Sequence, residues 1–324
     1  MVTAENIRMK LSVAIVAYNQ DRFIGQAIES VLAQRVNFDY EIVIGEDCST
    51  DYTRAVVLDL HRRYPDRIVP ILRERNIGAL RNLESTLTVC RGKYLAILEG
   101  DDYWTSVDKI QKQVDFLEAH PDCAISCHRV RFLDETRAVE AEIFPSLPAG
   151  RYTIKDLLKG NFVMTCSAVL RLDQCGPLPT CFSTMRVGDW PRSVLAARRG
   201  NIELMDEIMA VYRVHSGSMW SSMSHLERYE ECSQMLKALD KYLCFEYTDT
   251  IRQTIGDFYL EMASIMRRHG KRLETARHVI SCLRNGGWRA GRQRPLVGLA
   301  AYVLIGSWYR VFFRAKSVKS AELL

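Results

Sequence analysis

Three carboxylates stand within four residues directly after an apolar run. The run, Lys93–Leu98, is typical of a buried strand, and Glu99-Gly100-Asp101-Asp102 follows it at once. Like charges this close repel one another, and a bound divalent cation is the natural remedy. Hard oxygen ligands suit Mg²⁺ or Mn²⁺, which proteins often hold jointly with substrate phosphates. The pattern predicts a metal site, with a solvated acidic turn that caps a helix near Asp108 as the alternative.

A second acidic turn, Glu46-Asp47-Cys48-Ser49-Thr50-Asp51, follows an earlier apolar run. Ser49 or Asp51 is expected to cap the helix that starts near Tyr52, because short oxygen-bearing side chains accept the unpaired N–H groups there. Glu46 and Asp47 remain, and a carboxylate at such a place can accept hydrogen bonds from a nucleobase or a ribose. The turn therefore predicts a nucleotide contact.

Both turns belong to an alternating pattern over residues 11–131, which is typical of βαβ units around a parallel sheet. Most of the runs are continuously apolar rather than alternating, as expected for strands buried on both faces. Ligands of such sheets bind outside the carboxyl ends of the strands, where both acidic turns lie. The predicted strands are Leu11–Ala17, Glu41–Ile44, Ile68–Leu72, Lys93–Leu98 and Ala124–Val130, and the predicted helices are Phe23–Gln34, Tyr52–Arg63, Ala79–Val89 and Lys109–Ala119.

The pattern changes twice further along the chain. Residues 132–222 are broken by prolines, with short strands predicted at Val163–Leu170 and Ile208–Val214, and we expect an acceptor-binding half there. From Leu226 to Leu283 a helical pattern predicts an extension. We therefore expect a catalytic domain over residues 1–222, with its donor half at about 1–131, and a helical extension over 223–324.

The segment Pro295–Tyr309 has fifteen residues without a charge and basic residues on both sides. A spanning helix needs about twenty apolar residues. Two alternatives stay open: a helix packed on the protein or on a second subunit, and an interfacial helix, within 295–313, that lies on a membrane.

Net charge, cysteine spacing and the first apolar run limit the partners, metal sites and compartment that we expect for this chain. The net charge, 44 − 39 = +5, is a modest excess that does not argue for nucleic acid. The ten cysteines include no C-x-x-C pair, and the one tight cluster, Cys123, Cys127 and His128, is either a zinc site or a set of buried side chains. The apolar run Leu11–Ala17 is too short for a signal peptide, so we expect a cytoplasmic protein, peripheral on the inner face of the plasma membrane if 295–313 binds there.

Four motifs together resemble the family-two inverting glycosyltransferases with the GT-A fold, an α/β fold with a Rossmann-like, mostly parallel sheet flanked by helices. The resemblance covers residues 11–220, about two thirds of the chain. The motifs are Ser12-Val13-Ala14-Ile15-Val16-Ala17-Tyr18-Asn19, the acidic turn Glu46–Asp51, Asn76-Ile77-Gly78 with Arg81-Asn82, and Leu98-Glu99-Gly100-Asp101-Asp102.

The resemblance implies roles for the matching residues. Asp47 would contact the base, most often uracil, and Arg81 would approach the diphosphate. Asp101, with Glu99 or Asp102, would hold the metal, Mn²⁺ or Mg²⁺. The other residues implied in the nucleotide pocket are Ala17, Tyr18, Asn19, Glu46 and Asn76.

Two positions depart from the family's pattern. Glu99 stands where the family most often has Asp, and its extra methylene favours Asp101 as the direct metal ligand. Cys48 replaces the usual glycine of the second motif, which puts a glycine-only backbone geometry there in doubt.

The chemistry also needs a general base, because a hydroxyl is a poor nucleophile until its proton is being removed. The family has a carboxylate some ninety residues beyond the metal motif, and Asp189, in Gly188-Asp189-Trp190, stands at the matching place. A helix cap for the segment from Pro191 is the alternative. His215, after Tyr212-Arg213-Val214, resembles a family element that returns a histidine to the metal or diphosphate; the alternative is a structural histidine.

The resemblance thus implies a metal-dependent transferase with a nucleotide-sugar donor, UDP-sugar favoured, and a saccharide or lipid-linked saccharide acceptor, in surface polysaccharide synthesis. A nucleotidyltransferase or a dehydrogenase would need a glycine-rich phosphate loop, which Ala17–Arg22 lacks. The alternative from another class is a catalytically silent scaffold of a polysaccharide assembly. The retention of Asp47, Asp101, Asp102 and Asp189 together argues against a silent scaffold, because unneeded buried carboxylates destabilise a fold.

Overall fold

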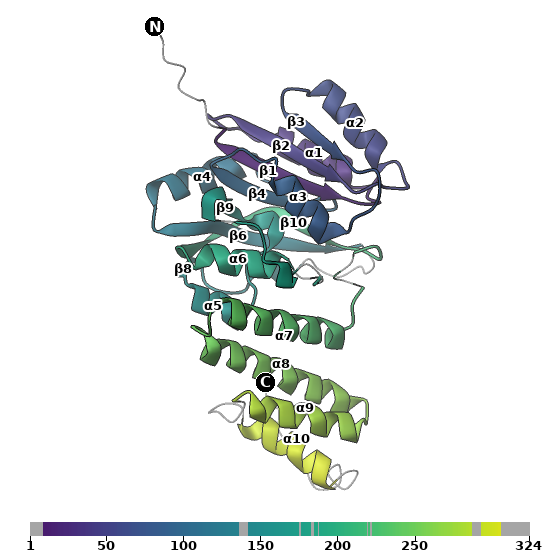
Figure 1. Cartoon of the computed structure of the whole chain (residues 1–324), viewed down its shortest axis with the longest axis vertical. Coiled ribbons are helices and arrows are strands. Elements are labelled where there is room, and N and C mark those ends of the chain that lie inside the picture. The colour runs from purple at the N-terminus through teal and green to yellow at the C-terminus, as the bar shows by residue number, and fades with distance from the viewer. Residues whose placement is uncertain are drawn as a thin grey trace, which may run out of the picture. The chain divides into compact units, whose positions relative to one another are not determined.

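The computed structural model describes residues 9–135, 142–174, 176–182, 185–186, 188–218, 220, 222–286 and 293–305. The chain divides into two compact units, residues 1–222 and 223–324. Figure 1 shows a sheet with helices around it in the first unit and helices alone in the second.

The first unit is built on a mixed sheet of ten strands in the order β3-β2-β1-β4-β9-β6-β10-β5, with β7 beside β6 and β8 beside β10. The first four strands of this order are parallel, and β6 and β10 are parallel to each other. The short β9 joins the two sets by pairing antiparallel with both β4 and β6. The strands are β1 (Leu11–Ala17), β2 (Tyr40–Glu46), β3 (Ile68–Leu72), β4 (Tyr94–Glu99), β5 (Tyr103–Trp104), β6 (Cys123–Asp134), β7 (Ile143–Phe144), β8 (Gly150–Tyr152), β9 (Val169–Arg171) and β10 (Asn201–Val214).

Helices follow the strands as the alternating pattern predicts. The crossover helices are α1 (Ile24–Leu32), α2 (Thr53–Arg63), α3 (Ala79–Leu87) and α4 (Lys109–Ala119). Two more helices come later in the chain: α5 (Ile154–Lys159) follows β8, and α6 (Asp189–Ala197) lies between β9 and β10. The strand predicted at Val163–Leu170 is wrong in part, because Thr165–Ser167 form a 3₁₀ turn and only the end of the segment joins the sheet. A short apolar run does not distinguish a buried strand from a buried turn.

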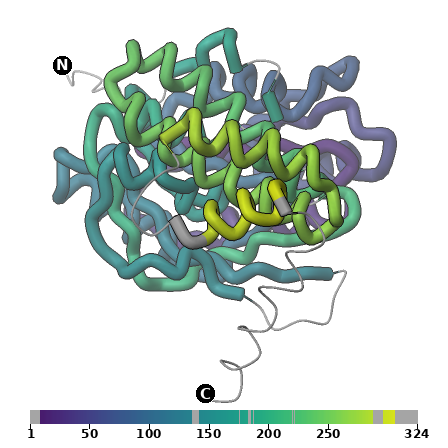
Figure 2. The backbone as a smooth tube through the Cα atoms, turned by 90° about the horizontal axis from the view of Figure 1, so that it is seen from below, coloured from purple at the N-terminus to yellow at the C-terminus, as the bar shows by residue number. Residues whose placement is uncertain are grey.

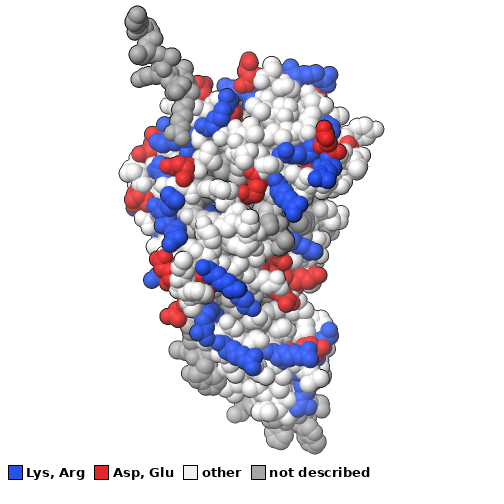
Figure 3. All heavy atoms as spheres, in the orientation of Figure 1, with Lys and Arg blue, Asp and Glu red and all other residues white. Residues whose placement is uncertain are grey.

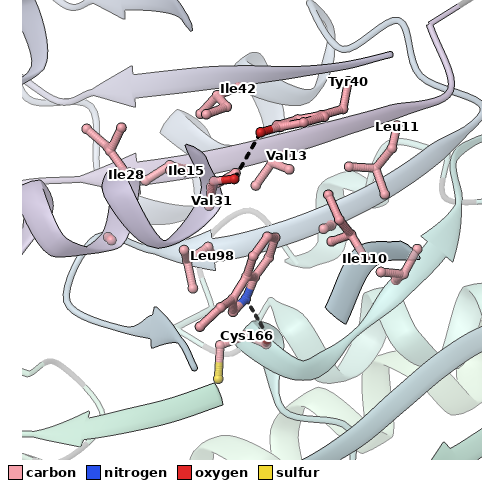
Figure 4. Close-up of a cluster of buried hydrophobic side chains, with 14 of the residues drawn as sticks. Leu11, Val13, Ile15, Ile28, Val31, Tyr40, Ile42, Leu98, Ile110 and Cys166 are labelled. Atoms are coloured by element: carbon pink, nitrogen blue, oxygen red, sulfur yellow. Dashed lines mark hydrogen bonds between the residues drawn. The ribbon is translucent and has the colours of Figure 1, made fainter. Parts of the chain in front are cut away.

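The core lies between the sheet and its helices (Figure 4). Leu11, Val13 and Ile15 of β1 are fully buried, which matches their place between two parallel neighbours. Two aromatic side chains in this core have hydrogen-bond partners: the Tyr40 hydroxyl donates to the Val31 carbonyl over 3.0 Å, and the Trp104 indole N–H donates to the Cys166 carbonyl over 2.9 Å. These bonds hold α1 and the 3₁₀ turn to the sheet without leaving an unpaired donor.

The Cys123, Cys127 and His128 cluster is a set of buried core side chains. The Cys127 thiol donates to the Glu203 carbonyl, and His128 Nδ1 contacts the Arg129 carbonyl at 2.7 Å. Among the described residues no group of three His, Cys, Asp or Glu is arranged to hold a metal ion. The zinc alternative is therefore not supported, and these side chains serve packing.

Lys109 is a fully buried cation at the start of α4. Its Nζ contacts Gln113 Oε1 at 2.8 Å and lies 4.2 Å from the centre of the Trp104 ring. Burial lowers the pKa of Lys109 to about 7. The folded chain therefore loses this proton near neutral pH, whereas the unfolded chain keeps it to a much higher pH.

This difference predicts how Lys109→Met changes stability. Between pH 7 and the pKa of an unfolded lysine, the unfolded chain binds more protons, so the stability of the native protein rises with pH, by at most about 1.4 kcal/mol per pH unit. Below pH 7 both states are protonated and the cost of burying the charge is constant. The Met variant should be more stable at pH 7 and should lack this rise in urea unfolding, whereas the exposed control Lys155→Met should keep it. A rise that persists in Lys109→Met would contradict the assignment.

The second unit contains four described helices, α7 (His225–Tyr242), α8 (Thr248–Arg268), α9 (Arg272–Arg284) and α10 (Gln293–Ile305). Ser224 and Glu227 form a capping box at the start of α7. Figure 2 shows α8, α9 and α10 next to one another, and their contacts agree. No helix within the described ranges is long and apolar enough to cross a membrane. Residues 306–313 of the predicted interfacial segment lie outside the described residues.

Candidate active site at the carboxyl edge of the sheet

The acidic turn after β4 packs tightly against the turn after β1. The Gly100 N–H donates to the Val16 carbonyl over 3.0 Å. A Cβ at position 100 would lie 2.5 Å from Gln20 Oε1 and 3.2 Å from the Ala17 Cβ. A larger residue at this position would require the Gln20 and Ile24 side chains to shift, so Gly100 permits the close packing of the two turns.

Asp101 meets His215, which lies 114 residues further along the chain. His215 follows the end of β10, and its Nε2 lies 3.0 Å from Asp101 Oδ2. The Gly217 N–H donates to His215 Nδ1 over 3.2 Å, so in the neutral ring Nε2 carries the proton and donates to Asp101. The Phe23 ring packs against the imidazole with 4.8 Å between ring centres. The structure thus brings together two of the predicted metal-site residues.

Asp102 points into the protein instead. Its side chain is 1% exposed, and its Oδ1 accepts the backbone N–H of Arg213 over 2.8 Å. Burial, with Asp101 and Glu99 nearby, raises the pKa of Asp102 well above its ordinary value. Asp102 therefore ties the acidic turn to β10, and this position favours Asp101 over Asp102 as a metal ligand.

Glu99 and Asp189 line one cavity of about 100 Å³. Burial, together with the charges of Asp101 and Asp189, raises the pKa of Glu99 to about 8. The walls come from α3, β4, β9 and α6, with Arg186 and Arg192 as the basic residues. The predicted base and one of the predicted metal carboxylates thus share a half-buried, largely apolar space, in which charges interact more strongly than in water.

Asp189 is the first residue of α6 and is held in place there. Asn161 Nδ2 donates to Asp189 Oδ2 over 2.9 Å. Burial raises the pKa of Asp189, while the N–H groups at the start of α6, Asn161 and the Arg192 charge oppose that rise. The carboxylate is thus poised to exchange a proton nearer to neutral pH than an exposed aspartate is.

Arg192 and Glu84 join α6 to α3. Neither residue belongs to the motifs from which the site was predicted. Arg192 is 3% exposed and forms an ion pair with Glu84. Glu84 also accepts the Leu178 backbone N–H over 3.0 Å. The pair links the helix that carries Asp189 to the helix that follows Asn76 and Gly78. Its signal in the sequence is weak, because the partners are 108 residues apart.

Asp47 directly follows β2 and holds the loop before α3 through hydrogen bonds. Its two carboxylate oxygens accept the backbone N–H groups of Ile77 and Gly78, each over 2.9 Å. Asn76 Oδ1 also accepts the Gly78 N–H, over 3.1 Å, and Gly78 has a φ of +89°. Asp47 is only 2% exposed, so in this structure it shapes the loop, and a contact with a base would use the second lone pair of a carboxylate oxygen.

Glu46 differs from what sequence reasoning expected. It is fully buried, Arg54 donates to its Oε2 over 2.5 Å, and the Ser49 N–H donates to its Oε1 over 2.6 Å. Both oxygens therefore shape the acidic turn, which leaves Glu46 away from the nucleotide surface. The N-cap of α2 is Tyr52, which makes no side-chain cap bond, while Asp51 Oδ1 accepts the N–H of Thr53, the first residue of the helix, over 2.9 Å.

The remaining predicted nucleotide residues line the same edge. Asn19 has a φ of +53°, and its Oδ1 accepts the Thr50 N–H over 2.8 Å, which joins the turns after β1 and β2. Tyr18 and Arg81 are exposed, and Ala17 is buried beneath them at the end of β1. Tyr18 and Arg81 are thus free to contact a ligand, whereas Ala17 and Asn19 shape the loop.

Cys48 occupies the position where the family usually has glycine, and it has a φ of +60°. The left-handed conformation costs a residue with a Cβ about 1–2 kcal/mol, and glycine avoids this cost. Because glycine also loses about 0.5–1 kcal/mol of entropy on folding, Cys48→Gly should change the free energy of unfolding little or raise it by up to about 1 kcal/mol. The branched Cys48→Val should lower it by more than 1 kcal/mol. Urea unfolding of both variants checks this order, and equal stability of Val and Gly would contradict it.

Comparisons with known proteins identify the family. The profile of glycosyl transferase family 2 matches residues 12–174, which is half of the chain. This chain belongs to glycosyl transferase family 2. The match contains both acidic turns and the loop before α3, and it ends before Asp189 and His215.

Several proteins are similar in sequence. An uncharacterised Mycobacterium tuberculosis protein is 39% identical over 214 residues, which are 65% of this chain and 61% of that protein. The chain thus spans less than two thirds of this relative's length. An Escherichia coli enzyme named as a UDP-Glc:α-D-GlcNAc-diphosphoundecaprenol β-1,3-glucosyltransferase, WfaP, is 29% identical over 71% of this chain and 86% of its own.

Solved structures match the fold. Staphylococcus aureus TarS, in complex with UDP-GlcNAc, aligns with a TM-score of 0.64 and 18% identity, over 92% of this chain and 89% of its own. The Pyrobaculum calidifontis mannosyltransferase PcManGT, in complex with GDP-Man and Mn²⁺, aligns with a TM-score of 0.54 and 15% identity, over 92% and 87%. The predicted GT-A fold with its helical C-terminal extension is confirmed.

Proposed function

We propose that this protein is an inverting glycosyltransferase that moves a sugar from a nucleotide-diphospho-sugar, UDP-sugar favoured, to a hydroxyl of a saccharide or lipid-linked saccharide in surface polysaccharide synthesis. The observation that carries the proposal is the cavity shared by Glu99 and Asp189, beside the Asp101–His215 pair. The named relatives support the class of reaction, while the sugars in the names and complexes of the compared proteins differ.

Asp189 acts as the general base in this proposal. Its carboxylate takes the proton of the acceptor hydroxyl while that oxygen attacks the anomeric carbon. A single displacement by the acceptor leaves no covalent sugar on the enzyme, and the configuration at the anomeric carbon is therefore inverted. The bonds from Asn161 and the N–H groups of α6 hold the carboxylate in one orientation during the transfer.

The residues at the acidic turn fit a divalent metal. Glu99 and Asp101 are close enough for the charge of Asp101 to raise the pKa of Glu99, a repulsion that a cation relieves. Because no three His, Cys, Asp or Glu side chains of the described residues are arranged around one point, we assign Asp101 as the direct protein ligand, with Glu99 and His215 near it, and substrate phosphates would supply further ligands. Ligation through His215 Nε2 would require the other tautomer and the loss of the Gly217 bond. Without ligation, the Nε2–H that contacts Asp101 here would be available to the diphosphate once Asp101 holds the metal. When bound, Mn²⁺ or Mg²⁺ would neutralise charge on the departing nucleotide diphosphate.

The nucleotide is assigned to the turns after β1 and β2 and the loop before α3. Asp47 would accept from the base, and the exposed Arg81 would approach the diphosphate. Residues 1–131 form the donor half in this proposal and residues 132–222 the acceptor half.

Calorimetric titration with UDP, GDP and dTDP, each with and without Mn²⁺, tests the proposal. We expect manganese-dependent binding that strongly prefers one nucleotide, UDP first. Binding of another nucleotide would keep the transferase and change the donor. Binding of none, together with no donor hydrolysis, would favour the silent scaffold and leave Asp189 as a helix-terminal residue.

A further inference from the structure

Charge is distributed very unevenly along this chain. Residues 267–324 contain 13 Lys and Arg and 2 Asp and Glu, a net charge of 13 − 2 = +11. The rest of the chain has 31 − 37 = −6, and the two values sum to the overall +5. Figure 3 shows Lys and Arg side chains running across the helices of the C-terminal unit on the face it presents. A basic segment on an otherwise acidic protein indicates an anionic partner for that segment.

The outward face of α9 combines positive charge with exposed apolar side chains. Leu273, Arg277, Ile280 and Arg284 follow one another at steps of three and four residues, so they lie along one side of the helix, and all four are exposed. Leu273 is 76% exposed and Ile280 is 48% exposed. We call these four residues the basic-apolar face. The other side of α9 carries Thr275, Val279 and Cys282, which are buried.

The neighbouring helix α10 adds exposed apolar side chains. Leu296 and Leu299 are buried, whereas Val297 is 54% exposed and Leu304 is 78% exposed. Arg272 Nη2 donates to the Leu304 carbonyl over 2.7 Å, which satisfies a carbonyl at the end of α10 and fastens the two helices together. Large apolar side chains and arginines are thus exposed on adjoining helices of the same unit.

We propose that the basic-apolar face of α9 docks on an anionic phospholipid bilayer surface. Arginine side chains pair with lipid phosphates, while Leu273 and Ile280 enter the boundary between headgroups and acyl chains. A second copy of the chain would bring one segment of +11 against another, and nucleic acid would contact the arginines and leave the leucine and isoleucine in water. The mixture of charge and apolar side chains on one face therefore favours a lipid surface, and this inference does not depend on the proposed function.

The test is co-sedimentation of the full chain with vesicles of phosphatidylcholine alone and of mixed phosphatidylglycerol and phosphatidylcholine. We expect binding only to the mixed vesicles, weakened by salt. Arg277→Ala with Arg284→Ala should weaken the partitioning by about five-fold per arginine. Leu273→Ser with Ile280→Ser should weaken it by about ten-fold or more at unchanged charge. Arg62→Ala with Arg63→Ala, an equal loss of charge on exposed positions of α2, should leave binding within about two-fold.

Three results would overturn the proposal. They are failure of the wild-type chain to bind mixed vesicles, equal losses in the α9 and α2 arginine pairs, and dimerisation that requires Leu273 and Ile280 in the absence of vesicle binding. Circular dichroism and urea unfolding of each variant verify that its helices fold, and the nucleotide titration is repeated to follow the first unit. A variant that binds nucleotide as before but no longer binds vesicles supports the basic-apolar face as a separate binding surface. A wild-type chain that binds vesicles but no nucleotide supports this inference and contradicts the proposed function.

Discussion

Asp189→Asn is expected to lower the turnover number for sugar transfer by about 10²–10⁴-fold, with little change in the affinity for the donor. The amide cannot take up the acceptor's proton. It keeps an oxygen that can accept from Asn161, so the local structure is retained. Because the fold no longer holds a buried charge there, the variant should be at least as stable as the wild type. Steady-state kinetics, donor calorimetry and urea unfolding measure the three quantities.

The matched control for this prediction is Asp66→Asn, the same substitution at an exposed aspartate in the loop after α2. It should leave turnover unchanged. In the wild type, kcat/KM should fall as the pH is lowered through the raised pKa of Asp189, because only the ionised carboxylate acts as a base. A variant that transfers sugar at nearly the wild-type rate while binding donor would remove Asp189 from the mechanism.

Asp101→Asn is expected to weaken manganese-dependent donor binding and turnover by about 100-fold or more. A neutral amide is a poorer ligand for a hard cation than a carboxylate, and a metal contact of this kind contributes several kcal/mol. The same change leaves His215 Nε2 without its charged partner and removes one of the charges that raise the pKa of Glu99. Titration of the variant with nucleotide and Mn²⁺, followed by assays of transfer, measures the loss.

Asp108→Asn is the control, because Asp108 is an exposed carboxylate seven residues beyond Asp101, at the start of α4. It should bind nucleotide and Mn²⁺ as the wild type does. Removal of divalent cations with a chelator should reproduce the Asp101→Asn phenotype in the wild type and add little in the variant. Wild-type affinity and full metal response in Asp101→Asn would show that the metal, if one is used, is held elsewhere.

The sequence predicted most of the first unit because its signals are local. Strands buried on both faces need continuous apolar runs, and crossover helices need apolar residues at three- and four-residue steps. β1, β3 and α4 lie at the predicted residues, and β2 and β4 differ from prediction by one or two residues at their ends. β10 begins seven residues before the predicted Ile208, because register shifts interrupt its pairing with β6 and obscure the pattern.

The amino-acid sequence by itself determined that Asp47 and Asp101 lie at one edge of the sheet, because residues that follow parallel strands meet there. Only the tertiary structure decided which carboxylates are already engaged: Glu46 by Arg54, and Asp102 by the backbone of β10. It also decided that Asp101 meets His215 and that Glu99 shares a cavity with Asp189. Glu46 and Arg54 are eight residues apart, but Asp102 and Arg213, Asp101 and His215, and Glu99 and Asp189 are 90 or more positions apart, and no local period encodes their pairing. These pairings are decided by the place of β10 in the sheet and by the packing of α6.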